Sequence, residues 1–569
     1  MNRKLRTVIA IIIAIIYTCL ITSCQKHDSS LSIDIDKQSL LTLDSTKSDS
    51  VVDDGPVKGG VLNLFCTYPD TLDPLLTKNP YLQKYFSLIF DSMIKLDKSQ
   101  KPMGQLCDKW YISEDGYTWT FHVREGIVWQ DGFPFTAEDI KFTIEKIISH
   151  KQNSIYSVLI DNISSFKIVD RNTIEFRLKK PNAFTAELMT FPIISSRFYG
   201  KSENVIKAFN TKFPPGTGAY SFEAYEENES IFFTANKSWW FRKLNNNTEI
   251  PYIPEIKIKF FKNSREAFSA FQTGSIDIIS VNDDDTGIYS WKTDVTSKKY
   301  ANGKWDFISI NLSDKILSDK VVRQFISSCI NKSEIVGDIL PGRAVESEIP
   351  LIPGSWLYET DEWVETLSNN EKKLLALNID TKKQLIENGL APKKLEILVN
   401  EENSDRIKVA EKVAQNLKNN GMEVTVNIVK WDKLISLVQS KKYDLAILGC
   451  TIPNYPDLSY IYSTPYADYQ RFTATSGNHV VTNISGYKND EVACTIENIY
   501  KSKNRDEIKR LFSELKIILN DEIPYIGLYF YYNSVIYNKN VRGNIDPYIW
   551  DEYNNIAEWY ISGGHSSLK

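Results

Sequence analysis

Length, composition and charge narrow the possible functions of this chain. It has 569 residues, of which 42% are hydrophobic and 24% charged, and its formal net charge is −5. This length has room for two or three domains, and the acidic balance argues against nucleic-acid binding, which requires a basic patch. The seven cysteines and five histidines are scattered, without a C-x-x-C or H-E-x-x-H motif, so we expect neither a disulfide framework nor a metal site.

The first residues have the three parts of a secretion signal. Basic residues precede an apolar run from Val8 to Ile21, which is short for a membrane span, and the run ends in "ITSC". A small residue directly before a cysteine resembles the lipobox of bacterial lipoproteins. The resemblance implies a signal peptide at 1–23, a lipid on Cys24 and an anchor on the outer face of the cell membrane. The alternative is an ordinary signal or anchor helix that contains a cysteine.

Residues 24–58 are polar and rich in Ser, Asp, Lys and Thr. Their scattered aliphatic residues have no clear period and cannot build a core. We therefore expect a flexible tether between the lipid and the folded part.

The segment 116–132, "GYTWTFHVREGIVWQDG", predicts a half-buried strand rather than a catalytic cluster. Large and polar residues alternate over 117–124, which is the period of a strand with one buried face. His122, Arg124 and Glu125 therefore have a structural explanation, on the outer face or in the turn. The inner face is formed by Tyr117, Trp119, Phe121 and Val123.

A helix is predicted after this segment. Thr136 is its expected N-cap, and Asp139 three residues later makes a variant of the capping box. Its apolar stripe is formed by Ile140, Ile144, Ile147 and Ile148.

Two later segments, 256–280 and 424–448, each predict strand, helix and strand, with Asp277 and Asp444 at matching places. Before the second, a strand at 395–399 and a helix with N-cap Ser404 are expected. Together these elements predict a β-α-β-α-β run, hence a parallel sheet with right-handed crossovers. In open α/β sheets, ligands lie beyond the carboxyl ends of the strands. For the last strand, expected at 443–449, that place is the loop Cys450–Asp457.

The segment 106–143, "LCDKWYISEDGYTWTFHVREGIVWQDGFPFTAEDIKFT", resembles the signature region of a known family. That family is the extracellular solute-binding proteins of family 5, which feed peptide and nickel ABC importers. Further segments are similar to family motifs in family order: Gly59–Thr77, Pro214–Trp240, Ser318–Val336 and Asn520–Asn544.

The resemblance implies an α/β fold of the type II periplasmic-binding-protein (Venus flytrap) kind, with two lobes and an extra subdomain in the first. We expect lobe I at 59–305, with the inserted subdomain at about 96–210, lobe II at 306–525, and a return to lobe I at 526–569. The implied function is to capture a peptide in the interlobe cleft and deliver it to a membrane permease. We expect a monomer that is not an enzyme and has no cofactor.

The expected ligand loop departs from the family pattern. In many peptide binders of the family, a tryptophan follows the strand-ending glycine, and an acid four positions after the glycine holds the peptide amino terminus. Here the glycine is Gly449, but these positions are Cys450 and Pro453, Asp457 is not equivalent, and the arginine position of some relatives is Ile447. How a ligand amino terminus is held stays open. The expected ligand-binding residues are Tyr68, Lys78, Tyr156, Cys450, Thr451, Ile452, Pro453, Asn454 and Tyr455.

Two alternative functions remain. One is a binding protein for a nickel chelate, heme or another small solute. The other is a secreted hydrolase, but the sequence has no G-x-S-x-G motif, and its two S-x-x-K segments lack their companion motifs. The carboxylates of Asp283 and Asp285 are explained by a solvated loop.

Overall fold

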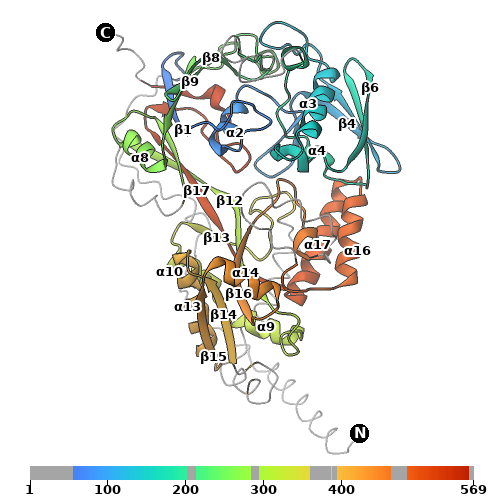
Figure 1. Cartoon of the computed structure of the whole chain (residues 1–569), viewed down its shortest axis with the longest axis vertical. Helices are drawn as coiled ribbons and strands as arrows, with labels where there is room; N and C mark the ends of the chain where they lie inside the picture. The colour runs from blue at the N-terminus through green and yellow to red at the C-terminus, as the bar shows by residue number, and fades with distance from the viewer. Residues whose placement is uncertain are drawn as a thin grey trace, which may run out of the picture. The chain divides into compact units, whose positions relative to one another are not determined.

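The fold is described from a computed structural model of the chain (Figure 1). The structure describes residues 55–200, 213–282, 294–358, 386, 392, 394–462 and 483–562. The predicted signal peptide, Cys24 and all but the end of the predicted tether lie outside these residues. Within the described part of the chain, no helix is long and apolar enough to span a bilayer.

The first sheet has four strands in the order β1-β10-β9-β8. Strands β1 and β10 are parallel, and the other neighbours are antiparallel. The predicted strand, helix and strand at 256–280 are confirmed as β10, α8 and β11. The elements of this region are β1 Val61–Thr67, α2 Pro80–Phe86, β8 Tyr220–Glu226, β9 Ser230–Ala235, α7 Phe241–Leu244, β10 Glu255–Phe261, α8 Ser264–Gln272 and β11 Ile278–Asn282.

A second four-stranded sheet, β4-β5-β7-β6, is antiparallel throughout. Strand β5 buries Trp119, Phe121 and Val123, which confirms three residues of the predicted inner face. Tyr117 precedes the strand and is half-buried, so including it was wrong. The elements here are β2 Ile94–Leu96, β3 Pro102–Gly104, β4 Cys107–Ile112, β5 Thr118–Val123, α3 Ala137–Ser149, η1 Ile155–Val158, β6 Ile163–Asp170, β7 Thr173–Leu178, α4 Thr185–Leu188 and α5 Ser196–Tyr199.

Helix α3 has the predicted capping box between Thr136 and Asp139. Ile140, Ile144 and Ile147 are fully buried, whereas Ile148 is 51% exposed. Including Ile148 in the apolar stripe was therefore wrong. Successive helical residues are rotated by about 100°, and the buried face of α3 is too narrow to include both Ile147 and its neighbour.

The largest sheet has seven strands, with the path β11-β17-β12-β16-β14-β15 and β13 paired to β17. Strand β14 is parallel to both β15 and β16, so the predicted β-α-β-α-β run is confirmed. The other described pairings of this sheet are antiparallel, so the sheet is mixed rather than parallel throughout. The elements are β12 Val295–Ile310, β13 Ala344–Glu346, β14 Lys394–Asn400, α13 Ser404–Asn419, β15 Glu423–Val429, α14 Trp431–Gln439, β16 Leu445–Thr451 and β17 Tyr525–Asn538.

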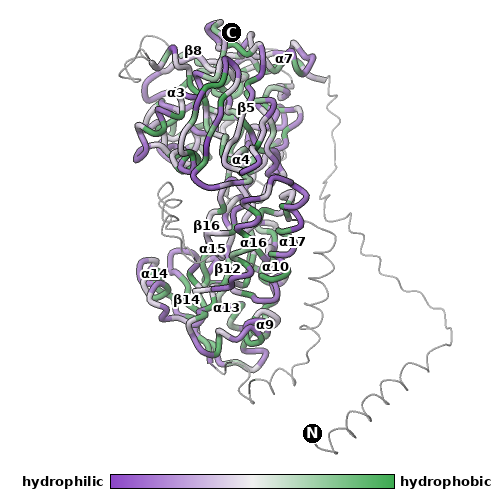
Figure 2. The backbone as a smooth tube through the Cα atoms, turned by 90° about the vertical axis from the view of Figure 1, so that its right-hand side faces the viewer, coloured by the Kyte–Doolittle hydropathy of each residue, from purple (hydrophilic) through white to green (hydrophobic). Residues whose placement is uncertain are grey.

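Hydrophobic and hydrophilic residues alternate along the backbone tube, as expected of elements with one buried face (Figure 2). The remaining elements are further helices and a short strand pair near the end of the described chain. These elements are α9 Lys320–Cys329, α10 Lys332–Ile339, α15 Ser459–Tyr462, α16 Asp490–Lys501, α17 Arg505–Glu522, β18 Val541–Arg542, η4 Ile556–Glu558 and β19 Tyr560–Ile561.

Strands β12 and β17 join two hydrophobic cores. Along β17, Ile526 and Leu528 belong to the core that contains β14, whereas Val535 and Tyr537 belong to the core that contains β1 and β10. The β12–β17 register shifts between Ala301 and Trp305, so a β-bulge interrupts the ladder where the strands pass from one core to the other.

The matching aspartates do the same structural work in the two strand–helix–strand units. The Asn63 backbone N–H donates to Asp277 Oδ2 over 2.7 Å, and the Glu396 N–H donates to Asp444 Oδ2 over 2.8 Å. Each aspartate directly precedes its strand, β11 or β16, and accepts a hydrogen bond from the third residue of another strand, β1 or β14.

Candidate functional site

In open α/β sheets, a ligand binds beyond the carboxyl ends of the parallel strands. In this sheet the corresponding place is the edge where β14 and β16 end, called the carboxyl edge below. Strand β16 continues to Thr451, two residues beyond the predicted end, because β12 pairs with it up to Lys304. The first two residues of the expected ligand loop therefore belong to β16, and the part outside the strand starts at Ile452.

Gly449 is required at this edge by a buried ion pair. An ideal Cβ on Gly449 would lie 2.0 Å from Arg406 Nη2 and 2.1 Å from Asp306 Oδ1. Arg406 Nε donates to Asp306 Oδ2 over 2.8 Å, and its Nη2 donates to Oδ1 over 2.6 Å. The glycine leaves room for the guanidinium to cross the strand.

Two tyrosines complete this ion pair. The hydroxyls of Tyr529 and Tyr531 donate to Asp306 Oδ2 over 3.3 and 3.2 Å, and Asp306 is only 1% exposed. Its hydrogen bonds to the described residues are charge-assisted, and such bonds are stronger than those between neutral groups. No sequence pattern indicates this cluster, since Asp306 and Arg406 are far apart in the chain; the only local signal is an arginine in the first turn of a predicted helix.

The loop after β16 is held by two buried side chains. Ile452 and Tyr455 are 5% and 4% exposed, and the Ile452 N–H donates to Gly303 O over 2.8 Å. Thr451 and Asn454 are exposed and Pro453 is half-buried. The loop thus exposes the side chains of Thr451 and Asn454 at the sheet edge, while Ile452 and Tyr455 face inward.

Contacts to the second sheet's region restrain the same loop. The ring centroids of Tyr455 and Phe184 lie 6.0 Å apart, and Gln100 Nε2 donates to Asn454 O over 3.3 Å. Cys450 Sγ lies 3.6 Å from the Tyr460 hydroxyl, and burial raises the pKa of its thiol to about 12. Cys450 is therefore a neutral thiol at physiological pH.

Asp457 is committed to a structural role. It is 3% exposed, and its Oδ1 accepts hydrogen bonds from the Ser459 N–H and hydroxyl over 2.7 and 2.6 Å. This carboxylate holds the first turn of α15 and is not directed to solvent.

The other expected ligand residues lie on separate elements. Tyr68 is 48% exposed and Lys78 is exposed, both in the loop between β1 and α2, where Asp70 Oδ2 accepts from the Lys78 N–H over 2.7 Å. Tyr156 is half-buried on η1. Among the described residues, no hydrogen bond or ring contact joins these three to the loop after β16.

The polar residues of the predicted β5 strand have structural partners. His122 Nδ1 lies 2.9 Å from Asp108 Oδ1. Arg124 Nε donates to Gln105 O over 2.7 Å, and its guanidinium lies over the Trp240 ring. Within the described ranges, no group of three or more His, Cys, Asp or Glu residues could hold a metal ion.

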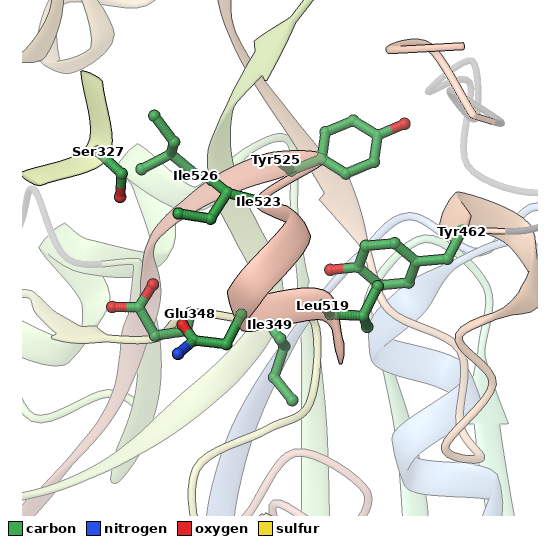
Figure 3. Close-up of a pocket in the computed structure, with 9 residues that line it drawn as sticks. Ser327, Glu348, Ile349, Tyr462, Leu519, Ile523, Tyr525 and Ile526 are labelled. Atoms are coloured by element: carbon green, nitrogen blue, oxygen red, sulfur yellow. The ribbon is translucent and has the colours of Figure 1, made fainter. Parts of the chain in front are cut away.

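A small pocket lies between the end of α17 and the start of β17. It has a volume of about 20 Å³, the space of one water molecule. Glu348 and Ser327 lie on one side of it, and the Tyr525 hydroxyl points away and accepts from the Ser485 N–H (Figure 3). It is too small for a peptide and is separate from the edge of β14 and β16.

Comparisons with known proteins give one consistent answer. A family model described as "Bacterial extracellular solute-binding proteins, family 5 Middle" matches residues 101–471. The oligopeptide-binding protein AppA of Bacillus subtilis is 22% identical over 501 residues, covering 84% of this chain and 87% of AppA. The dipeptide-binding protein of Escherichia coli is 23% identical over 486 residues, covering 79% of this chain and 85% of that protein.

A solved structure agrees with this match. The ABC transporter substrate-binding protein CtaP from Listeria monocytogenes has a TM-score of 0.69 and 19% identity, covering 89% of this chain and 99% of CtaP. At this identity the likeness establishes the fold, which is the predicted α/β fold of the type II periplasmic-binding-protein kind.

Proposed function

Because the chain belongs to family 5 of the bacterial extracellular solute-binding proteins, whose members serve ABC transporters and are not enzymes, we propose that its solute is a peptide. The peptide would be captured between two lobes, at the edge of β14 and β16, and passed to a membrane permease. The expected ligand residues in the β1–α2 loop, on η1 and after β16 would approach it from several elements.

One observation carries the choice of a peptide. The loop after β16 buries Ile452 and Tyr455 and turns Thr451 and Asn454 outward. The backbone groups of this loop that are not already bonded within the protein can pair with an extended peptide, independent of the peptide's side chains. The names of the relatives, an oligopeptide-binding and a dipeptide-binding protein, support the same choice.

Mass spectrometry of the ligand that remains on the purified mature protein tests this proposal. We expect a mixture of short peptides to be released on denaturation. Nickel, heme or another small solute in their place would contradict it. Incubation with these peptides should return them unchanged, since a binding protein does not cleave its ligand.

We further propose that a lipid on Cys24 anchors the protein outside the cell membrane. The proposal rests on the "ITSC" pattern after the apolar run. Metabolic labelling with a fatty acid should mark the wild-type protein and not Cys24→Ser. Labelling of the serine variant would contradict the anchor.

A further inference from the structure

The carboxyl edge of the large sheet carries a positive charge that no described side chain neutralises. Lys304 on β12 lies directly opposite Thr451 on β16, and both residues are exposed. Among the described residues, none forms an ion pair with Lys304. Lys304 therefore lies beside the loop that is expected to bind ligand, where its positive charge would repel the ammonium group of a peptide.

The register places Lys304 on the same face as the buried ion pair. Lys304 pairs with Thr451, and two residues along, Asp306 pairs with Gly449. Side chains alternate between the faces of a strand, so Lys304, Thr451 and Asp306 project to one face. Arg406 reaches the same face, because its Nη2 lies over Gly449.

Arg406 contributes a second donor there. Its Nε and Nη2 donate to the Asp306 carboxylate, whereas its Nη1 donates to no described residue. The side chain keeps 14% of its surface exposed. Helix α13 also begins at this edge with Ser404, so the positive end of its dipole adds to the potential.

Three carboxylates at this edge have partners other than Lys304. Asp306 is bound by Arg406, and Asp405 by Arg343, whose Nη1 lies 2.9 Å from Asp405 Oδ2. Glu402 accepts from the Trp431 N–H over 3.0 Å and from Asn400 Nδ2 over 3.1 Å. None of these acids is paired with Lys304, so its ammonium remains available to an anion.

We propose that Lys304, Thr451 and Arg406 Nη1 form a subsite for a carboxylate of the ligand, normally the carboxyl terminus of a peptide. Lys304 and Arg406 supply charge-assisted donors, and the Thr451 hydroxyl supplies a neutral one. The ligand would then be oriented by its carboxyl end, in a site where Pro453 and the buried Asp457 offer no acid for its amino end. This inference rests on the proposed peptide-binding function.

The experiment uses two synthetic peptide pools of identical sequences, two to nine residues long and without Asp or Glu. One pool has free carboxyl termini and the other has carboxyl-terminal amides. Peptides retained by the mature protein after gel filtration are quantified by mass spectrometry, and the best pair is titrated by calorimetry. We expect the free acid to bind about 10- to 100-fold more tightly, the range of a charged hydrogen bond.

Three variants locate the effect. Lys304→Gln removes the positive charge and should reduce the ratio of free-acid to amide affinity to within about threefold. Lys304→Arg keeps the charge and should retain most of the ratio. Position 304 is exposed, so both side chains fit there. Lys298→Gln removes the same charge from an exposed position on the same strand and should leave the ratio unchanged.

The outcomes separate the two proposals. Retention of neither pool would contradict peptide binding itself, and the subsite with it. Equal retention of both pools by the wild-type protein, or an unchanged ratio in Lys304→Gln, would contradict only the carboxylate subsite.

Discussion

At the residue scale, the structure explains why the strand-ending position is glycine. The family resemblance marked Gly449 as a matching residue but gave no cause. The cause is the Arg406–Asp306 pair, whose atoms occupy the space of a Cβ at this position. A residue near the ligand loop is thus fixed by a contact between strand β12 and helix α13, which no local pattern could indicate.

Substitution of Gly449 tests this account. Gly449→Ala should destabilise the protein by about 2–4 kcal/mol, because the methyl group must displace a buried, hydrogen-bonded ion pair. Urea unfolding measures the change. Gly337→Ala in α10 is the matched control, since nothing lies within 4 Å of its ideal Cβ; it should be neutral or stabilise by up to about 1 kcal/mol. Equal effects of the two substitutions would refute the steric explanation.

Asp91 should make stability depend on pH. Burial raises the pKa of its carboxyl to about 6, against hydrogen bonds from Trp240, Thr217 and Gln105, which lower it. A carboxyl with a raised pKa in the folded state stabilises the fold when protonated. This contribution is therefore complete below pH about 4, and it is lost as pH rises to and above 6, by about 3 kcal/mol in all.

The measurement compares wild-type and Asp91→Asn unfolding free energies at pH 4.5, 6 and 7.5. The asparagine cannot titrate, so the difference between the two proteins isolates Asp91. We expect the wild-type protein to lose stability relative to the variant as the pH rises. Parallel pH profiles would show that the pKa of Asp91 is not raised.

At the element scale, the sequence predicted most of the strands and helices that carry the site. The run β14-α13-β15-α14-β16 followed from strand-length apolar segments alternating with amphipathic helices. The errors are short and have physical reasons: α13 is capped by Asn403, whose side chain accepts from the Arg406 N–H, and not by the adjacent Ser404. Strand β16 gained two residues from pairing with β12, a tertiary effect.

The bulge in β12 is an element that no sequence pattern indicated. Asn302 Oδ1 accepts from the Lys304 N–H, and its Nδ2 donates to Asn533 Oδ1, both over 2.9 Å. Between them, Gly303 O accepts the Ile452 N–H of the ligand loop. The bulge therefore joins the loop to the strands that link the two cores.

Asn302→Ala should loosen this connection. Both side-chain bonds are lost, and we expect the Ile452 amide to exchange hydrogen at least about fivefold faster, as local opening costs about 1 kcal/mol less. Exchange mass spectrometry on a peptide that contains 450–455 gives the rate, and a peptide from β5 should keep its wild-type rate. Unchanged protection of the loop would show that the bulge does not restrain it.

At the scale of the whole molecule, the family and fold were predictable because five weak motifs occur in family order. The ligand's identity was not, because the chain departs from the family at the residues that usually hold a peptide. The structure adds that Asp457 is buried and capping α15, so it offers no ready substitute for the missing acid. The expected ligand-binding residues remain predictions.

Pro453 stands where many family members have an acidic residue that holds the peptide amino terminus. The consequence can be tested on the complete protein with bound peptides. If peptides bind, N-acetylation should weaken them by less than about tenfold, because Pro453 cannot bind an ammonium group. Pro453→Asp should then favour free-amine peptides over acetylated ones by about tenfold or more, while Ile452 and Tyr455 still anchor the loop. Pro453→Asn, which removes the proline without adding charge, is the control and should show little preference. Calorimetry on matched peptide pairs measures the ratio. A loss above about a hundredfold on acetylation in the natural protein would mean that another carboxylate holds the amino terminus.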